Sequence, residues 1–587
     1  MPNMLAMSFE GDLAPSFDLR CLTLGSRLPD GWGLAFYATG EPAAQVLKEP
    51  APHHGSIRSE IIRVWKHLES TLFVIHIRTA TWGRNTDANT QPFVRSLGGR
   101  DLTLAHAGSL ERRFSLSAPA IYEPVGATDS ELVFCEILNR ALAAGKRSLA
   151  DIGSSTLHAW LRELNAHGGM SLALTDGRDL FAYSDRRADD ALHVLELVPP
   201  YERVALTDAD LSLDLTARGT INRKGVIVSS SPLELSGVSS ARWRALSPGS
   251  LLVVRQGAVI AELAADPSTT VSTQRAPSTP PSSVRPAARR LIEAQPQRLL
   301  VRHHTVYRYQ RAVERSSHLL RLEPADDRLQ RLRSFALTVS VDNVAREFED
   351  VFGNRARRID IDTPFTELAI DARSIVDNYD ADPLSFAAVR KRTTIPLVWM
   401  PWQRHMLQPY LLPPELPESQ LLELASYAMT FVERNDYDLL DTLLDLNRSI
   451  FKEYAYRPGT TTLHTTPWDV YSQRRGVCQD FTNLFLCLAR LLGVPARYVC
   501  GYVFTGPKHA NHRMGEASHA WVQVYLPEVG WRGFDPTNGT VTQTDHVRVS
   551  VGRTFVDATP TSGTLYVGGG GETLEVEVRV DSEPLPL

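Results

Sequence analysis

The chain has 587 residues and a formal net charge of −5, with 43% hydrophobic and 22% charged residues. That length predicts three or four domains, and the nearly balanced charge excludes a strongly basic nucleic-acid-binding or membrane-surface protein. No apolar run reaches the roughly 18 residues of a membrane span, the N-terminus lacks a secretion signal, and the five cysteines are scattered. We therefore expect a cytoplasmic protein with no nucleic-acid or membrane partner, disulfide framework or metal site.

Residues 1–264 contain a series of short motifs beside strand-like or helical patterns. They are DGWG at 30–33, HIRTAT at 76–81, NTQPF at 89–93, AHAG at 105–108 and TDSE at 128–131. In this order they resemble the class II glutamine amidotransferases, which are N-terminal-nucleophile hydrolases. The resemblance implies a four-layer αββα sandwich, with Gly31 and Trp32 among the substrate-binding positions. It also matches Arg78 and Asp129 to the residues that hold the α-carboxylate and α-ammonium groups of glutamine.

The residues that perform the chemistry in that family are missing here. The family's mature chain begins with a cysteine where this sequence has Pro2, and its oxyanion asparagine falls at Ala107. Gln91 replaces a histidine of the family pattern. Loss of one oxyanion donor costs about a hundredfold in rate and loss of the nucleophile removes the covalent route, so we expect no glutamine hydrolysis. Arg78 and Asp129 then form either a retained amino-acid clamp or structural ion pairs.

The next two segments are a linker and a β-rich module. Residues 265–296 are rich in Pro, Ser and Thr, which predicts an extended linker. Alternating apolar residues predict strands over 297–385. HHTVYRYQ at 303–310, HLLRLEP at 318–324 and DVFGNRARRI at 350–359 resemble the β-sandwich that precedes bacterial transglutaminase-like cores. We expect no chemistry from this module.

Residues 386–560 are expected to form an α+β core around one amphipathic helix. From Cys478 to Leu492 apolar residues recur at three- and four-residue spacing, and Gly493 and Pro495 mark the end of the helix. Cys478 therefore lies in the first turn, where unpaired amides and the helix dipole favour a thiolate.

Further motifs complete a candidate catalytic set. They are GVCQDF at 476–481, LGVPARYVCGY at 492–502, ASHAWVQVYLP at 517–527 and GWRGFDPTNG at 530–539. In this order they resemble the bacterial transglutaminase-like core, which has a papain-type fold. The resemblance implies Cys478 as the nucleophile, His519 as the base and acid, and Asp535 as the residue that orients the imidazole.

The loop between His519 and Asp535 decides whether their side chains meet. A two-residue turn at 528–529 pairs Val522 with Asp535 and places the carboxylate on the wrong face of the sheet. A three-residue loop at 527–529 pairs Trp521 with Asp535, on the face of His519, at a diagonal Cα distance of roughly 7–8 Å. Gly530 suits the positive φ that such a loop needs.

The expected chemistry is a thioester on Cys478 that is transferred to water or to an amine. The Cys478 backbone N–H supplies one oxyanion donor, and the side chains of Gln473 and Trp468 are candidates for the second. No cofactor is needed. The expected substrate is a peptide, isopeptide or γ-glutamyl-type amide, and the oligomeric state stays open.

The sequence thus predicts an α+β multidomain protein with an αββα sandwich, a β-sandwich module and a papain-like core. A strand within 561–587 either closes a sheet or forms an exposed edge. The leading function is that of a cysteine-dependent amidase, peptidase or acyltransferase, with an inactive N-terminal domain that recognises substrate or acts as a scaffold. Two alternatives stay open: residual amidotransferase-type activity through the secondary amine of Pro2, or a non-catalytic binding scaffold. The intact Cys478, His519 and Asp535 argue against the scaffold.

Overall fold

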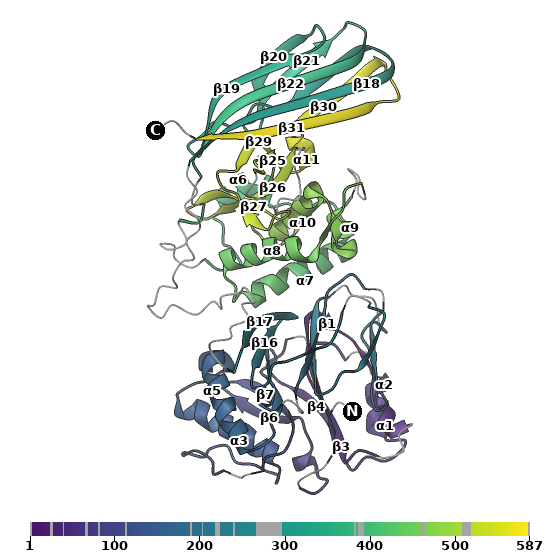
Figure 1. The fold of residues 1–587 in the computed structure, drawn as a ribbon, viewed down its shortest axis with the longest axis vertical. Coiled ribbons are helices and arrows are strands. Elements are labelled where there is room, and N and C mark those ends of the chain that lie inside the picture. Colours follow the sequence, from purple (N-terminus) through teal and green to yellow (C-terminus); the bar gives the residue numbers. More distant parts are fainter. Residues whose placement is uncertain are drawn as a thin grey trace. The chain divides into compact units, whose positions relative to one another are not determined.

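The structure is a computed structural model. It describes residues 3–584 except 24–27, 39, 65–67, 80–82, 112–113, 188–190, 202, 218–222, 239–240, 266–295, 381–382, 386–392, 460–464 and 507–517. The chain divides into two compact units, Met1–Pro280 and Pro281–Leu587 (Figure 1). Pro2 and nearly all of the expected linker lie outside the described residues. All five cysteines are buried and free.

The described part of the first unit is built on two stacked β-sheets. One has the order β15 (Arg244–Ala245), β10 (His193–Leu197), β13 (Gly225–Ser229), β1 (Met4–Leu13), β5 (Ser70–Arg78), β3 (Gly31–Ala38), β4 (Gln45–Pro50). The other has the order β17 (Ala258–Leu263), β16 (Leu251–Arg255), β9 (Asp179–Tyr183), β8 (Ser171–Thr175), β7 (Arg100–Ala107), β6 (Phe93–Leu97). Ala6 and Val74 of the first sheet are fully buried against Ala105 and Ala182 of the second.

Helices and a small sheet cover the outer faces of this pair. The second sheet packs on α3 (Asp129–Ala143), α4 (Leu149–Ile152) and α5 (Ser154–Leu164), with Leu138 and Leu161 buried against Leu172. The first sheet is covered by α1 (Arg20–Thr23), α2 (Ile57–Val64) and the sheet β14 (Glu234–Ser236), β11 (Ala205–Thr207), β12 (Ser212–Asp214), β2 (Ser16–Asp18). This layering is the predicted αββα sandwich.

The second unit begins with a β-sandwich around the long strand β18 (Gln297–Leu320). Its order is β19 (Gln330–Val339), β22 (Phe365–Asn378), β18, β21 (Arg355–Ile361), β20 (Val344–Glu349). The C-terminal strands β30 (Thr561–Gly568) and β31 (Thr573–Pro584) also pair with β18, and Val301 lies opposite Val580. The strand predicted within 561–587 therefore joins this sheet, and β31 is also an exposed edge, because among the described residues it pairs only with β18 and most of its side chains are exposed.

The remaining elements form the papain-like α+β core that the sequence predicts. Its sheet has the order β28 (Thr540–Val541), β27 (Gly530–Asp535), β26 (His519–Leu526), β25 (Ala496–Val503), β29 (His546–Gly552). The main helix, α10 (Cys478–Leu491), packs on β26, where Phe481 and Leu484 are buried with Val522 and Val524. The other elements are α6 (Pro401–Leu407), α7 (Glu418–Arg434), α8 (Leu439–Glu453), α9 (Pro467–Gln473), α11 (Phe555–Ala558) and the short pair β23 (Ala455–Tyr456) and β24 (Arg475–Gly476).

The ends of α10 confirm the predicted helix. It starts at Cys478 and ends at Leu491, and Gly493 adopts the left-handed φ of +72° that glycine tolerates best. The fold therefore places the candidate nucleophile at a helix N-terminus, beside a sheet that carries His519 and Asp535.

Candidate active site

Cys478 lies at a tightly fixed helix start. The Val477 N–H donates a hydrogen bond to the Asp480 carboxylate at 2.8 Å, which satisfies one amide that a helix start leaves without a partner. Gly476 makes room for this side chain, because a Cβ at Gly476 would lie 2.8 Å from the Asp480 Cβ. Cys478 is only 8% exposed, so its sulfur is largely shielded from water.

Arg474 anchors the segment that leads into Cys478. It follows α9 with a left-handed φ of +51°, and its side chain is buried. The guanidinium carbon lies 4.9, 4.7 and 4.9 Å from the ring centroids of Tyr427, Tyr454 and Tyr471. Nη1 also donates to the Tyr427 hydroxyl oxygen at 2.9 Å. Since a desolvated cation–π contact stabilises by about 2 kcal/mol, this tyrosine cage holds the backbone four residues before the nucleophile.

The hairpin between His519 and Asp535 has the three-residue loop that the sequence favours. Leu526 pairs with Gly530, and Gly530 has a φ of +87°. This register puts Asp535 on the face of His519, where the Asp535 Oδ2 and the His519 Nε2 are 2.9 Å apart. The structure thus brings the predicted base and orienting residue together.

Asp535 is fixed by donors on both of its carboxylate oxygens. Oδ1 accepts from the backbone N–H groups of Thr537 and Asn538 at 3.0 and 3.2 Å. Oδ2 accepts from the Asn538 Nδ2 at 2.7 Å in addition to its contact with His519. Because Asp535 is fully buried, these bonds keep the carboxylate ionised and correctly aimed.

His546 is a second imidazole on the same carboxylate. Its Nε2 lies 3.2 Å from the Asp535 Oδ2, and its Nδ1 lies 2.6 Å from the Asp545 Oδ1. The ring packs edge-on against Trp521, with centroids 5.2 Å apart. Asp545, His546, Asp535 and His519 therefore form a continuous chain of titratable groups, all buried except the partly exposed Asp545.

The charges of this chain stabilise protonated imidazoles and an ionised Asp535. Burial opposes the charge on His519, but the Asp535 carboxylate and the nearby Cys478 thiol raise the pKa of His519 to about 10. Burial also opposes the carboxylate, but His519 and His546 hold the pKa of Asp535 well below its usual range. Asp545 and Asp535 likewise raise the pKa of His546 to about 9 against its burial.

The Cys478 thiol lies near the His519 imidazole without a hydrogen bond of regular geometry between them. The Cys478 thiol contributes to the raised pKa of His519. Yet the His519 Nδ1 has no hydrogen bond of regular geometry to any described residue. Since Nε2 is bonded to Asp535, Nδ1 is the nitrogen that can exchange a proton with the sulfur.

In the first unit, the residues matched to glutamine binding are engaged by their own neighbours. Arg78 Nη1 donates to the Asn85 Oδ1 at 2.9 Å, and Nη2 donates to the Gly83 carbonyl oxygen at 3.1 Å. Asp129, the first residue of α3, accepts from the Leu110 N–H at 2.7 Å. Both side chains therefore fix neighbouring backbone or side-chain groups of their own domain.

The other matched positions also have structural partners. Trp32 is buried and donates from Nε1 to the Glu49 Oε2 at 3.0 Å, and Gly31 pairs with Arg78 between β3 and β5. Gln91 accepts the His106 N–H at 2.6 Å through Oε1. The methyl side chain of Ala107, at the end of β7, offers no hydrogen-bond donor.

Comparison with known proteins divides the chain between the same two units as the structure. The family model "Glutamine amidotransferases class-II" matches residues 1–279. The models "Bacterial transglutaminase-like N-terminal region" and "Transglutaminase-like superfamily" match residues 299–377 and 426–536. A putative glutamine amidotransferase of Escherichia coli is 30% identical over 38% of this chain and 82% of its own length. The chain therefore belongs to the class-II glutamine amidotransferase family through its first unit, and its second unit is similar to the transglutaminase-like models.

Individual relatives cover parts of the chain. An uncharacterized protein of Methanocaldococcus jannaschii is 34% identical over 40% of this chain, which spans 62% of that protein. An uncharacterized protein of Mycobacterium bovis is 31% identical over 48% of this chain and 92% of its own length. A solved structure of a predicted glutamine amidotransferase from Pseudomonas aeruginosa has 27% identity and a TM-score of 0.37, covering 44% of this chain and 99% of its own.

Within the transglutaminase-like core, the two candidate second oxyanion donors have other contacts. Gln473 is exposed, and its Oε1 accepts from the Arg475 Nε at 3.1 Å. Trp468 is half-buried, and its ring lies tilted against that of Tyr471, with centroids 5.6 Å apart. These contacts use the Oε1 acceptor of Gln473 and the ring of Trp468, whereas the Cys478 N–H lies at the first position of α10, where a helix leaves its amides without an intrahelical partner.

Sequence reasoning did not single out His546, Asn538 or Arg474. Asn538 lies within the motif at 530–539, and Arg474 lies two residues before the motif at 476–481. Their closeness in sequence to Asp535 and Cys478 is a signal that could have pointed to them. His546 begins an ordinary alternating strand, and the pairing of β28 with β27 together with that of β29 with β25 brings it to Asp535. Among the described helices, none has the length and hydropathy that a membrane span requires.

Proposed function

We propose that the chain is a cysteine-dependent amide hydrolase or acyltransferase. The observation that supports this most strongly is the buried 2.9 Å contact between the His519 Nε2 and the Asp535 Oδ2, beside Cys478 at the start of α10. Nucleophile, base and orienting residue then stand in the order that thiol catalysis requires.

In the first half-reaction, the Cys478 sulfur attacks the carbonyl carbon of an amide as a thiolate, with its proton held by His519. The oxygen of the tetrahedral adduct becomes anionic and accepts a hydrogen bond from the Cys478 N–H. The C–N bond then breaks, and the amine leaves with the proton from the His519 imidazolium. A thioester remains on Cys478.

In the second half-reaction, His519 takes a proton from water or from an amine as that group attacks the thioester. The C–S bond breaks and the thiolate–imidazolium pair is restored. Water gives hydrolysis and an amine gives a new amide. Asp535 stabilises the imidazolium in both halves, which agrees with the raised pKa of His519.

The substrate class that we propose is a peptide, isopeptide or γ-glutamyl-type amide. We further propose that the amidotransferase domain does not hydrolyse glutamine, because Pro2 and Ala107 stand at the nucleophile and oxyanion positions. The hydrogen bonds of Arg78 to Asn85 and Gly83 favour a scaffold over an amino-acid clamp. The domain then acts as a scaffold for the core or recognises its substrate.

The test is a trapping experiment on the full-length protein. A panel of peptide, isopeptide and γ-glutamyl amides is incubated with and without hydroxylamine, and adducts on each cysteine are measured by mass spectrometry. We expect an acyl adduct on Cys478 that hydroxylamine removes as a hydroxamate. Turnover that proceeds in Cys478→Ala, or an acyl adduct on another cysteine, would place the chemistry elsewhere.

A further inference from the structure

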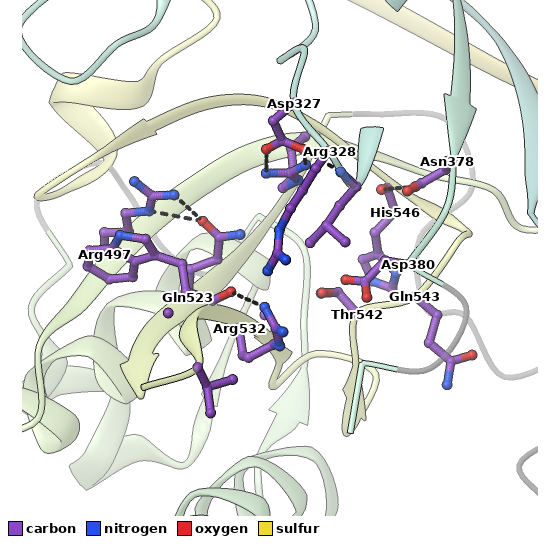
Figure 2. A pocket seen from close by; sticks show the side chains of 16 residues that line it. Asp327, Arg328, Asn378, Asp380, Arg497, Gln523, Arg532, Thr542, Gln543 and His546 are labelled. Carbon is purple, nitrogen blue, oxygen red and sulfur yellow. Dashed lines mark hydrogen bonds and ion pairs between the residues drawn. The ribbon is translucent and has the colours of Figure 1, made fainter. Parts of the chain in front are cut away.

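A polar pocket lies next to the triad network in the second unit. Its volume is about 350 Å³, and residues of β25, β26, β27 and β29 line it together with segments 327–329 and 378–380 of the β-sandwich (Figure 2). Gln523 is two register positions from Trp521 and four from His519, so all three side chains share one face of β26. The pocket therefore opens on the same sheet face as the triad imidazole.

Positive charge exceeds negative charge around this pocket. Among its described lining residues are the four guanidinium groups of Arg328, Arg497, Arg532 and Arg548 and the two carboxylates of Asp327 and Asp380. Arg548 is matched by Asp327 through two hydrogen bonds of 2.7 and 2.8 Å. Burial lowers the pKa of Arg532, and the nearby Asp380 carboxylate opposes that shift. In Figure 2 both side chains point toward Arg328. Two guanidinium groups are left in excess over the carboxylates.

The side chain of Arg497 is held in position by Gln523 and Trp531. Its Nε and Nη2 both donate to the Gln523 Oε1, at 2.9 and 2.7 Å, and its guanidinium carbon lies 4.2 Å from the centroid of the Trp531 ring. Burial lowers the pKa of Arg497 to about 10. The Tyr410 hydroxyl and the more distant Asp327 carboxylate oppose this shift. A desolvated cation whose hydrogen bonds go to a neutral amide and a neutral hydroxyl is stabilised when an anion enters beside it.

The pocket also contacts the triad through His546. This residue lines the pocket, and its Nε2 lies 3.2 Å from the Asp535 Oδ2. Its backbone is fixed from the pocket side, because the Asn378 Nδ2 donates to the His546 carbonyl oxygen at 2.7 Å. A negative charge placed in the pocket therefore acts on the imidazolium that shares Asp535 with His519.

We propose that this arginine-rich pocket binds a small molecule through an oxyanion group, a carboxylate or a phosphate, and that His546 transmits its occupancy to Asp535. The volume is within the range of small-ligand sites, roughly 300–1,000 Å³. Planar guanidinium groups match both oxyanions with paired hydrogen bonds. Binding does not depend on the proposed catalytic function, whereas the transmitted effect rests on it, so the two are measured separately.

The binding test titrates inorganic phosphate and, separately, succinate into the full-length protein by calorimetry at low ionic strength. We expect at least one of them to bind with a Kd below about 1 mM. Arg532→Gln and the exposed Arg328→Gln should each weaken binding at least tenfold. Arg346→Gln, an exposed arginine of β20 that does not line the pocket, is the matched control and should leave the Kd unchanged.

Phosphate binding alone identifies a phosphorylated ligand, and succinate binding alone identifies a carboxylate. Binding of neither probe overturns the proposal, as does binding that survives both pocket substitutions. Arg328→Gln lies at the exposed rim, so it keeps the test decisive if Arg532→Gln does not fold.

The coupling test measures the rate of Cys478 alkylation by iodoacetamide with and without the saturating probe. We expect at least a twofold change in the wild-type protein and none in His546→Gln. A probe that binds without changing the wild-type rate would refute transmission through His546. If Cys478 does not alkylate at all, the proposed catalysis fails while the binding result stands.

Discussion

The two enzyme-like folds of this chain differ in what their central sites retain. In the transglutaminase-like core, a thiol, an imidazole and a carboxylate meet inside a buried network that includes His546 and Asn538. In the amidotransferase domain, the layers and the apolar core are intact, yet the nucleophile position holds Pro2 and the oxyanion position holds Ala107. The same chain thus contains one fold with a candidate catalytic set and one fold that lacks the cysteine and the asparagine of its family pattern.

The comparison teaches that a fold depends on many atoms and its chemistry on few. The sheets of the amidotransferase domain are held by dozens of buried apolar side chains, so a few changed residues do not disturb them. Gln91 is a residue that differs from the family pattern and has a structural role. Its Oε1 accepts a hydrogen bond from the His106 N–H, and its Nε2 donates one to the Ser130 Oγ. Buried polar groups that are fully hydrogen-bonded stabilise the fold whether or not they catalyse.

Removal of the nucleophile should have the largest effect. We predict that Cys478→Ala lowers amide turnover by at least about 10⁴-fold, because the thioester can no longer form. Cys487→Ala is the matched control in the same helix, and burial raises the pKa of Cys487 to about 12, so its thiol is unreactive. Steady-state kinetics on the best amide of the panel provides the measurement. Comparable losses in both variants would point to damage of α10 rather than of the site.

Replacement of the orienting residue should have the next largest effect. We predict that Asp535→Asn reduces turnover by about 10²- to 10⁴-fold. The asparagine cannot stabilise the imidazolium, and its amide favours the wrong tautomer of His519. A thermal unfolding curve, recorded beside the kinetics, separates this loss from a loss of folded protein. A variant with full activity would remove Asp535 from the mechanism.

His546 should have a smaller effect, with a signature of its own. We predict that His546→Gln lowers turnover about tenfold and moves the acidic limb of the pH profile to higher pH. The reason is that His546 contributes to the lowered pKa of Asp535, so its removal lets that carboxylate take a proton at higher pH. A merely structural role would lower the rate without moving the limb.

The raised imidazole pKa values also predict how stability depends on pH. A group whose pKa is higher in the folded state stabilises fully below its unfolded pKa of about 6.5 and loses that contribution as pH rises through the folded value. With values of about 10 for His519 and about 9 for His546, the free energy of unfolding should fall between pH 6.5 and 10. Urea unfolding of His519→Gln should show a flatter dependence over this window, and an equal slope would contradict the assigned charges.

The smallest expected effect belongs to the amidotransferase domain. We predict that full-length Cys478→Ala releases no ammonia from glutamine above the uncatalysed rate, since neither Pro2 nor Ala107 supports the thioester route. A coupled ammonia assay measures this, and the wild-type protein shows whether the core itself acts on glutamine. Ammonia release at enzymatic rates in the variant would show that both folds are active.

The sequence predicts the architecture and the local geometry of the candidate site well, but not its wider network. The apolar period over α10 and the loop arithmetic before Gly530 place Cys478, His519 and Asp535 correctly, because local chain geometry decides both. The role of His546 depends on a non-local strand pairing, and the tyrosine cage of Arg474 joins three separate helices or helix ends. Such long-range packing leaves no periodic signal in one sequence.

The central claim is that Cys478 and His519 form a reactive pair, and site-resolved alkylation tests it most directly. The full-length protein is treated with iodoacetamide at pH 7, and the rate at each cysteine is followed by mass spectrometry. We predict that Cys478 reacts at least about 100-fold faster than Cys487 or Cys500, whose thiol pKa values are raised by burial, and that His519→Ala abolishes the difference. Equal rates at the three cysteines, or a fast Cys478 that is unaffected by His519→Ala, would contradict the account.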